Sequence, residues 1–308
     1  MIYGAATQIR NQLYDRGMLR ARRLSQPVIS VGNLSVGGSG KTPFVMLLGE
    51  LLKSSNVQFD VLSRGYGRRN GRVLAVDCNG SPDDFGDEPL LIARRLGCPV
   101  IVGKDRYRAG VFAEQKFGPH LHILDDGFQH RSLARDFDIV MLASQDLDDR
   151  LLPQGRLREP VRSLNRADAL VVAEDFAASL PVSGKHIWKL RRGISLGSSP
   201  LRPIVFCGIA RPRAFLDQLH QSGIREISSK FYRDHHRYSE GDVRDLIKLK
   251  DKNKADGFIT TEKDAINLGP LLQKLGEVAI ARVTMELEQP AAVLDTLLSV
   301  ISKRGASA

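Results

Sequence analysis

The feature that most constrains this chain is the stretch of residues 27–52, PVISVGNLSVGGSGKTPFVMLLGELL. A short apolar run rich in β-branched residues precedes a glycine-rich loop, and Lys41 and Thr42 then open an amphipathic helical pattern. In a strand, loop and helix of this kind, the loop N–H groups and the helix N-terminus converge on one point, where they bind phosphate. The stretch therefore predicts a nucleotide-phosphate site within an α/β domain.

Each group of this loop has a chemical role in the prediction. Lys41 can place positive charge near the β- and γ-phosphates, and the Thr42 hydroxyl can ligate Mg²⁺. The residues that we expect to bind the nucleotide are Gly37, Gly38, Ser39, Gly40, Lys41 and Thr42. Ser35 stands where the strict pattern has glycine, so the first turn of the loop can differ. A flexible Gly/Ser loop before an ordinary helix is the alternative, and the flanking strand pattern argues against it.

Composition bounds the class of protein. A chain of 308 residues is expected to form two domains, and 42% hydrophobic with 26% charged residues is typical of a globular protein. The formal net charge of +10 favours anionic partners, whether nucleotides, nucleic acid or an acidic membrane surface. Cys78, Cys98 and Cys207 are widely spaced, which indicates neither a disulfide framework nor a zinc site. No apolar run reaches the roughly 18 residues of a spanning helix, and no signal peptide is recognisable.

Residues 1–24 predict a basic amphipathic helix. Ile2, Ala6, Ile9 and Leu13 recur at helical spacing, and arginines are frequent along the segment. Such a helix can lie in an anionic membrane interface with its arginines at the headgroups. A helix packed on the core with a solvated basic face is the alternative, and composition does not choose between the two.

The rest of the chain alternates strand-like and helix-like runs, which is the signature of an α/β fold. In the first half, strands are expected at 59–63, 72–77, 99–103, 120–124 and 137–143, with helices at 87–96 and 105–117. In the second half, strands are expected at 169–172, 187–190, 204–206, 224–227, 258–260 and 279–283, with helices at 212–221, 240–249 and 265–275. We therefore expect a P-loop NTPase-like α/β domain at 25–160 and a second, smaller α/β domain at 161–289. An amphipathic helix at 290–303 can pack back on the first domain.

Two adjacent carboxylates follow the expected strand at 120–124. Asp125 and Asp126 end the apolar run in HLHILDDGFQH, as in a Walker B element whose carboxylate reaches the metal held by Thr42. A pair of aspartates that caps a turn is the alternative, and the phosphate loop upstream argues against it. Asp125 and Asp126 are therefore candidate magnesium ligands.

Several other segments place charged residues at turns, although each segment alone is more often structural than chemical. SRGYGR at 63–68 has arginines and glycines that suit an anion-binding turn, while the carboxylates of FGDEP stand at a helix start, where they are common caps. The segment LLPQGRLREP at 151–160 contains Pro and Gly residues typical of a connector, and such a connector can carry an arginine toward the phosphate loop. FYRDHHRY and TTEKDA follow strand-like runs, and helix capping explains the aspartate of TTEKDA.

Taken in this order, SVGGSGKTP, SRGYGR, FGDEP, LDDGFQH, PQGRLREP, RDHH and TEKDA resemble the tetraacyldisaccharide 4'-kinase family of lipid A biosynthesis. The resemblance extends from about residue 13 to residue 264, and a serine at position 35 is usual in that family. It implies two α/β/α domains joined by a two-stranded linker, with the active site in the cleft between them.

The resemblance also implies an activity and a location. The expected enzyme is a phosphotransferase with an alcohol group as acceptor. It moves the γ-phosphoryl group of MgATP to the 4'-hydroxyl of a tetraacylated glucosamine disaccharide 1-phosphate, which gives the 1,4'-bisphosphate. The expected location is the cytoplasmic face of the inner membrane, with the N-terminal helix as a peripheral attachment. The expected partners are the anionic glycolipid and the membrane surface, with no nucleic acid and no obligate protein partner.

By the same resemblance, individual residues acquire roles. Asp87 would accept the proton of the sugar hydroxyl, and His235 would reach across from the second domain to orient Asp87 and raise its basicity. Arg158 would offset charge on the transferring group. The residues expected to contact the substrate are Arg64, Arg68 and Glu159.

Two competing functions remain at this point. One is a P-loop kinase for another small molecule, and the other is a nucleotide-dependent switch without acceptor chemistry. A switch hydrolyses its nucleotide slowly, transfers nothing to lipid, and needs neither Asp87 nor His235.

Overall fold

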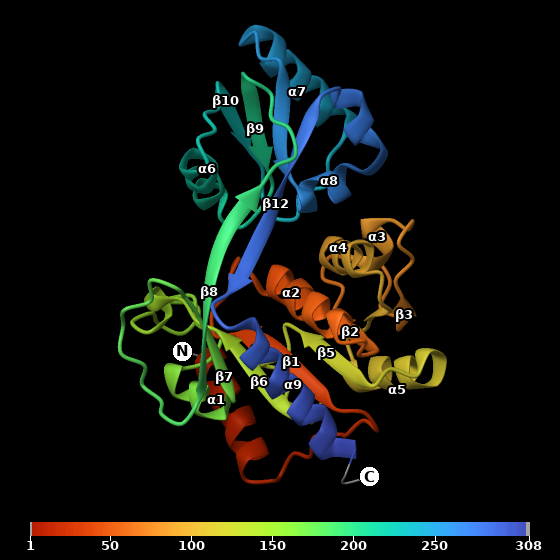
Figure 1. The fold of residues 1–308 in the computed structure, drawn as a ribbon, viewed down its shortest axis with the longest axis vertical. Helices are drawn as coiled ribbons and strands as arrows, with labels where there is room; N and C mark the ends of the chain where they lie inside the picture. The colour runs from red at the N-terminus through yellow and green to blue at the C-terminus, as the bar shows by residue number, and fades with distance from the viewer. Residues whose placement is uncertain (1, 306–308) are drawn as a thin grey trace.

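The computed structural model describes residues 2–305, and their strands form one continuous sheet (Figure 1). The strands are β1 (Val28–Asn33), β2 (Phe59–Ser63), β3 (Leu74–Ala75), β4 (Val100–Val102), β5 (Leu121–Asp125), β6 (Phe137–Met141), β7 (Ala169–Ala173), β8 (His186–Ser195), β9 (Pro203–Cys207), β10 (Ser228–Phe231), β11 (Gly257–Thr261) and β12 (Val278–Leu287). Their order across the sheet is β10-β9-β11-β12-β8-β7-β6-β1-β5-β2-β4-β3.

Helices cover the sheet. They are α1 (Ile2–Asp15), α2 (Lys41–Ser54), α3 (Pro82–Phe85), α4 (Asp87–Leu96), α5 (Arg106–Phe117), α6 (Pro212–Gln221), α7 (Glu240–Lys252), α8 (Glu262–Leu268) and α9 (Pro290–Gly305). Short 3₁₀ turns occur at η1 (Ser144–Asp146), η2 (Val161–Arg166) and η3 (Gly269–Leu275).

Two long strands connect a larger and a smaller α/β unit. β8 and β12 pair antiparallel, in a register that runs from Arg282 opposite Ser195 to Leu287 opposite Leu190. In Figure 1 they rise from the larger unit, which holds β1, to the smaller unit, which holds β9, β10 and β11. Apart from the β8–β12 pair and the short β3–β4 pair, neighbouring strands run parallel, as the alternating pattern predicted. The expected class, a P-loop NTPase-like domain with a smaller α/β domain on a two-stranded linker, is confirmed.

The pairing of β7 bears on where the two units divide. β7 lies beyond residue 160 but pairs in parallel with β6, so it extends the sheet of the larger unit. We therefore propose that the division lies within β8 and β12 rather than at residue 160.

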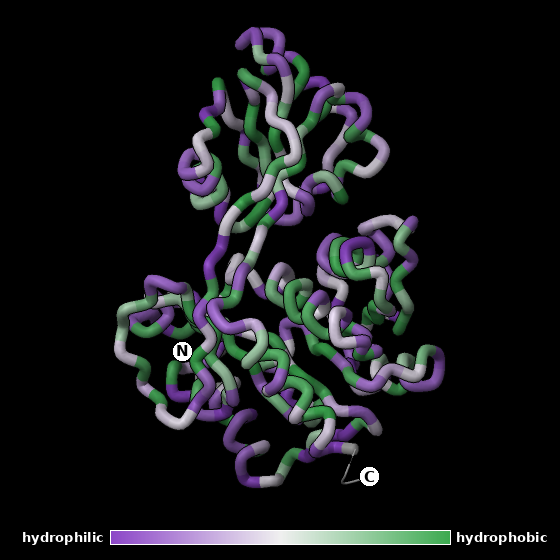
Figure 2. The backbone as a smooth tube through the Cα atoms, in the orientation of Figure 1, coloured by the Kyte–Doolittle hydropathy of each residue, from purple (hydrophilic) through white to green (hydrophobic). Residues whose placement is uncertain are grey.

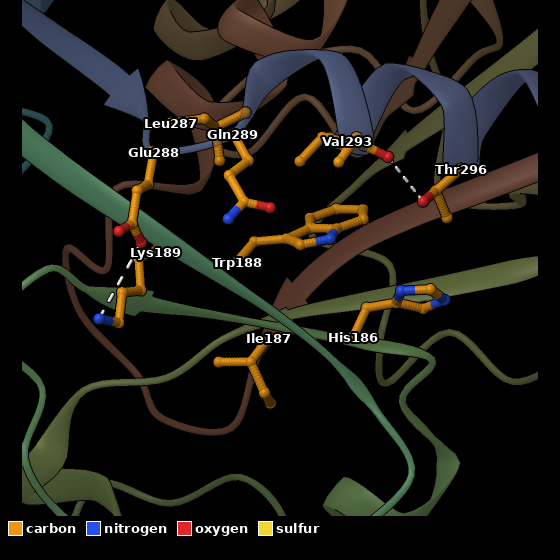
Figure 3. A pocket seen from close by; sticks show the side chains of 10 residues that line it. His186, Ile187, Trp188, Lys189, Leu287, Glu288, Gln289, Val293 and Thr296 are labelled. Carbon is orange, nitrogen blue, oxygen red and sulfur yellow. Dashed lines mark hydrogen bonds and ion pairs between the residues drawn. The ribbon is translucent and has the colours of Figure 1, made fainter.

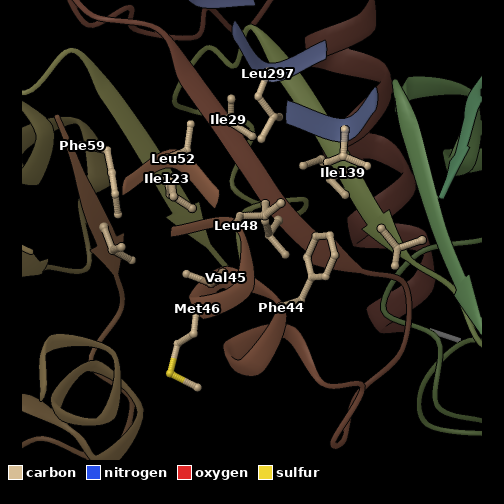
Figure 4. Close-up of a cluster of buried hydrophobic side chains, with 14 of the residues drawn as sticks. Ile29, Phe44, Val45, Met46, Leu48, Leu52, Phe59, Ile123, Ile139 and Leu297 are labelled. Atoms are coloured by element: carbon tan, nitrogen blue, oxygen red, sulfur yellow. The ribbon is translucent and has the colours of Figure 1, made fainter. Parts of the chain in front are cut away.

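The core of the larger unit lies between the sheet and α2. Phe44, Leu48 and Leu52 recur every four residues along α2 and are fully buried against the sheet, beside Leu297 of α9 (Figure 4). Burial of a large apolar side chain stabilises the fold by roughly 1.5–3 kcal/mol. Figure 2 shows the corresponding hydrophobic colouring along α2 and the central strands. This packing holds the N-terminus of α2, and with it the phosphate loop, in place.

The N-terminal helix is shorter than the expected span of residues 1–24. It ends at Asp15 because Gly17 adopts a φ of 70°, and the N–H of Met18 bonds back to the carbonyl of Leu13. Turns and bends follow through residue 19, and Arg22 forms a parallel bridge with Leu133. The residue at position 1 lies outside the described residues.

Several further boundaries differ from the prediction, and among them the strands expected at 187–190 and 279–283 are longer, as β8 and β12. The strand expected at 72–77 is reduced to the two residues of β3, and the helix expected at 265–275 breaks at Gly269, whose φ is 52°. Residues 224–227 form no strand, because the N–H of Ile224 bonds to the carbonyl of Leu219 and closes the end of α6. The edge strand β10 therefore begins at Ser228.

Candidate active site

The phosphate loop joins the carboxyl end of β1 to the N-terminus of α2. Gly40 caps α2 with a φ of 84°, a conformation that favours glycine. The Lys41 ammonium lies 3.1 Å from Asn33 Oδ1, 3.3 Å from Asp126 Oδ1 and 3.4 Å from Ser39 Oγ. The lysine is thus held by the end of β1 and by the strand-end aspartate, so its charge is directed at the loop.

The structure explains why serine is accepted at position 35. Ser35 forms an antiparallel bridge with Leu157, and its backbone φ is not positive. On either side, the N–H of Val36 donates to the carbonyl of Arg156 and the N–H of Arg158 donates to the carbonyl of Leu34. The connector therefore lies beside the phosphate loop, and the first turn of the loop needs no glycine.

Asp126 forms ion pairs with two cationic side chains. Both terminal nitrogens of Arg158 donate to it, at 2.9 and 2.8 Å, and Lys41 lies 3.3 Å away. Burial alone would raise the pKa of Asp126, but Arg158 and Lys41 hold it well below its usual range. Arg158, which also donates to Asn33, is thus brought to the phosphate loop through Asp126.

Asp125 has a different environment. The Ser63 hydroxyl donates to its Oδ2 at 3.0 Å, whereas its Oδ1 is buried and has no hydrogen-bond partner within residues 2–305. Burial, together with the charges of Glu88 and Asp126, raises the pKa of Asp125 to about 7. A buried oxygen without a donor fits a cation ligand, so Asp125 suits Mg²⁺ better than Asp126 does.

No group of three or more His, Cys, Asp or Glu side chains forms a metal cluster among the described residues. Magnesium in kinases is commonly held by one or two protein groups together with the nucleotide phosphates, so such a cluster is not required.

A carboxylate and an imidazole meet between the two units. Asp87, the first residue of α4, is only 2% exposed, and His235 follows β10 in the smaller unit. His235 Nδ1 lies 2.9 Å from Asp87 Oδ2, and the Asn267 amide donates to the same oxygen at 3.0 Å. Asp87 and His235 are 148 positions apart in the chain, so the fold alone brings them together.

The electrostatics of Asp87 correct one expectation. Burial raises its pKa, but the hydrogen bond from His235 and the charge of Lys263 outweigh burial and lower the pKa to about 2. His235 therefore orients Asp87 and keeps it ionised. It does not raise the basicity of Asp87, because donors to a carboxylate stabilise the charged form.

Cationic side chains gather beyond the ends of β2 and β4. Arg64 is exposed, whereas both terminal nitrogens of Arg68 are buried without a hydrogen-bond partner within residues 2–305. Arg106, which the motif analysis missed, is 4% exposed; burial lowers its pKa to about 10 despite the attraction of Asp125 and Asp126. Arg106 looks like an ordinary first residue of a helix, so only its burial reveals it. The group suits an anionic ligand.

Glu159 lies apart from this group. It is fully buried, accepts from Arg166 at 2.8 Å and accepts from Asn11 of α1 at 2.8 Å. Because successive side chains of an extended segment point to opposite sides, Arg158 faces the phosphate loop while Glu159 faces α1.

A cavity of about 290 Å³ lies between β8 and α9 (Figure 3). The side chains of Trp188, Val293 and Thr296 line it, whereas none of the candidate site residues does. The cavity is therefore separate from the candidate active site.

Comparison with known proteins decides the family. The family model for tetraacyldisaccharide-1-P 4'-kinase (LpxK) matches residues 1–302. The chain belongs to the tetraacyldisaccharide-1-P 4'-kinase family.

The chain is also similar to members of this family from several bacteria. The tetraacyldisaccharide 4'-kinase of Koribacter versatilis is 47% identical, with 98% of each chain covered. That of Geobacter metallireducens is 37% identical, with coverage of 94% of this chain and 92% of the relative. A crystal structure of LpxK from Aquifex aeolicus in complex with ATP superposes with a TM-score of 0.80 at 36% identity, covering 97% of this chain and 96% of that one.

Members of this kinase family act on a lipid, which raises the question whether any helix of this chain could cross a bilayer. Within residues 2–305, no helix combines the length and the hydropathy needed to cross a bilayer.

Proposed function

We propose that this chain is an ATP-dependent kinase that phosphorylates the 4'-hydroxyl of a tetraacyldisaccharide 1-phosphate. The observation that carries the proposal is the pairing of Asp87 with His235 across the two units. A nucleotide switch has no use for such a pair, whereas a kinase needs a group that receives the acceptor hydroxyl. Glu88, next to Asp87, acts electrostatically on Asp125, which supports a common site for donor and acceptor.

The donor half consists of the phosphate loop and its neighbours. The amides of residues 37–42 and the Lys41 ammonium hold the β- and γ-phosphates, and Arg158 adds charge beside them. Thr42 and Asp125 would hold Mg²⁺, which would neutralise charge on the phosphate oxygens. Asp126 keeps Lys41 and Arg158 in position.

The acceptor half is completed by the smaller unit. Asp87 is ionised at neutral pH and accepts a hydrogen bond from the 4'-hydroxyl, which places the oxygen in line with the γ-phosphorus. In a loose phosphoryl-transfer transition state the hydroxyl proton passes late to the Asp87 carboxylate as the O–P bond forms and ADP leaves, so positioning outweighs base strength. Because His235 comes from the other unit, the acceptor is oriented only when the two units are together, which keeps water out.

Arginines beyond β2 and β4 suit the substrate phosphate. Arg64 and Arg68 remain our candidates for contact with the 1-phosphate, and the buried guanidinium of Arg106 reinforces the positive potential there. The contacts of Glu159 with Arg166 and Asn11 support a structural role for that residue instead.

The packing of α1 supports a peripheral attachment to the membrane. The side chains of Thr7 and Asn11 are buried against the protein, whereas Ile9, on the opposite side of the helix, is 58% exposed. Beyond the helix, Met18 is 69% exposed. A helix that buries Thr7 and Asn11 and exposes Ile9 beside Arg10 is suited to an anionic lipid interface, so we infer attachment to the cytoplasmic face of the inner membrane.

The proposal is tested by transfer of a labelled phosphate. We expect the protein to convert radiolabelled ATP and a tetraacyldisaccharide 1-phosphate into a 1,4'-bisphosphate. Asp87→Asn, which keeps the shape of the side chain, should lower kcat by roughly 10²- to 10⁴-fold with little change in the KM for ATP. ATP hydrolysis without a lipid product would favour the switch, and near-normal turnover by the variant would remove Asp87 from its role.

A further inference from the structure

Lys263 occupies the centre of the contact between the two units. It lies in the first turn of α8, and its side chain is only 16% exposed. Its ammonium nitrogen lies 3.2 Å from Glu88 Oε1, 3.4 Å from Asp234 Oδ1 and 3.9 Å from Asp87 Oδ2. The fourth neighbour is His235 Nε2, at 3.2 Å. Lys263 therefore contacts the ring nitrogen that Asp87 does not.

The chemistry of these groups determines how His235 is protonated. A lysine ammonium has three donors and no acceptor, so a contact with Nε2 requires that Nε2 carry a lone pair. The proton of the neutral ring must then be on Nδ1, from which it is donated to Asp87. A proton on Nε2 would instead place an N–H against the ammonium.

Short-range contacts hold Lys263 and the His235 loop as one piece. Thr261 caps α8, and Asp264, the residue after Lys263, is buried. Asp264 Oδ1 accepts from the N–H of Gly208 and from the Tyr238 hydroxyl, both at 2.7 Å. Since the N–H of His235 bonds to the Gly208 carbonyl, Asp264 fixes the loop to α8. The geometry of Lys263 and His235 is therefore set within the smaller unit.

The same helix meets α4 at three points. Glu262 accepts from Arg95 at 2.8 Å, Lys263 pairs with Glu88, and Asn267 donates to Asp87. Lys263 thus contacts α4 of the larger unit and the His235 imidazole at the same time.

We propose that Lys263 is a positioning residue for phosphoryl transfer, which holds His235 as the neutral tautomer with its proton on Nδ1 and seats it against Asp87. This inference rests on the proposed role of Asp87. It extends that role, because it assigns to the second domain a residue whose charge controls the protonation of the dyad.

The charges around His235 predict how its titration responds. Asp87 and Glu88 face this site from α4, Asp234 from its own loop and Lys263 from α8, while the ring of Tyr66 lies 5.2 Å from the imidazole. Burial and the Lys263 charge lower the pKa of His235, whereas Asp87 and Asp234 raise it, and the net result is a pKa above the ordinary value for histidine. Removal of the ammonium should therefore raise that pKa, so that the imidazolium forms at a higher pH. An imidazolium forms an ion pair with the Asp87 carboxylate, which then accepts less readily from the substrate hydroxyl. Activity at low pH should therefore fall.

The test compares Lys263→Met with Lys263→Arg, which keeps a donor. The control is Lys274→Met, because Lys274 lies in the same unit but is 54% exposed and pairs with Glu240. We expect Lys263→Met to lower kcat by about 10²-fold, since a small misplacement of reacting groups has an effect of that size. The acidic limb of its kcat–pH profile should move to higher pH while the KM for ATP stays constant. Lys263→Arg should recover part of kcat.

A spectroscopic measurement tests the tautomer without any variant. In protein labelled with ¹⁵N-histidine, the neutral ring of His235 in the unaltered chain, recorded at a pH above the end of its titration, should show a protonated Nδ1 and an unprotonated Nε2. A proton on Nε2 at that pH would overturn the inference. So would a normal kcat and pH profile in Lys263→Met while Asp87→Asn is inactive, a result that leaves the proposed function intact. An active Asp87→Asn would instead contradict the proposed function itself.

Discussion

Two adjacent and chemically identical residues, Asp125 and Asp126, have different environments. Asp125 ends β5 and points one oxygen at Ser63, with the other oxygen buried and unbonded. Asp126 turns into the left-handed region, with a φ of 50°, and its carboxylate meets Arg158 and Lys41. The change of backbone direction between them separates a candidate metal ligand from a residue that orients cations.

This difference predicts distinct effects of two matched substitutions. Asp125→Asn should raise the Mg²⁺ concentration for half-maximal activity by at least about tenfold, because even indirect partners of a metal are worth 10- to 100-fold. Asp126→Asn should leave the Mg²⁺ dependence near normal and raise the KM for ATP, because Lys41 and Arg158 lose their anchor. Magnesium titrations of kinase activity for both variants measure this. The reverse pattern would assign the metal to Asp126.

At the scale of elements, α1 shows how a pattern can predict a helix and leave open which of its faces meets the protein. The spacing of apolar residues predicted one buried or membrane-facing stripe. In the fold, Asn11 bonds to Glu159 and the carbonyl of Asn11 accepts from Arg131, so the polar side of the helix docks on the protein. Arg22 and Arg23 pair with Asp105 and Asp136, so part of the basic run is held by the larger unit.

The orientation of α1 leads to a prediction about membrane binding. Ile9→Asp should weaken binding to vesicles that contain anionic lipid by about tenfold, since it removes an apolar contact worth roughly 1.5–3 kcal/mol and adds a repelled charge. Leu201→Asp is the matched control, because Leu201 is 91% exposed in the smaller unit. Vesicle co-sedimentation compares them. Equal binding by the two variants would remove α1 from the interface.

At the scale of the whole molecule, a buried histidine joins two neighbouring strands of the sheet to a helix that covers it. His122 of β5 and Asp60 of β2 are fully buried, with His122 Nδ1 2.9 Å from Asp60 Oδ1. Glu114 of α5 lies 3.4 Å from the other ring nitrogen. Burial alone would lower the pKa of His122, but hydrogen bonds to both carboxylates raise it to about 9. A charged histidine therefore links two strands and a helix of the larger unit.

The raised pKa makes this stabilisation depend on pH. The folded state holds the His122 proton up to about pH 9, whereas the unfolded chain releases it near pH 6.5. The contribution of His122 is thus complete below pH 6.5, declines above it and is lost beyond about pH 9. Urea unfolding of the unaltered chain and of His122→Gln should show a difference in unfolding free energy that shrinks over this range. His186→Gln, at an exposed histidine, is the control, and a constant difference would contradict the prediction.

The sequence by itself determined what depends on neighbours along the chain. The phosphate loop, the aspartates after β5 and the alternation of strands and helices are local patterns, because a strand, a turn and a helix cap are each specified within a few residues. The order of the motifs identified the family, and the match over residues 1–302 confirms it.

The tertiary structure decided what depends on direction across long separations. It paired Asp87 with His235, turned Glu159 toward α1 and placed Lys263 against the imidazole. No local pattern encodes these contacts, because they follow from the path of β8 and β12 between the units and from the side to which each side chain points. The family motifs indicated which residues carry the chemistry, and packing determined which atoms meet.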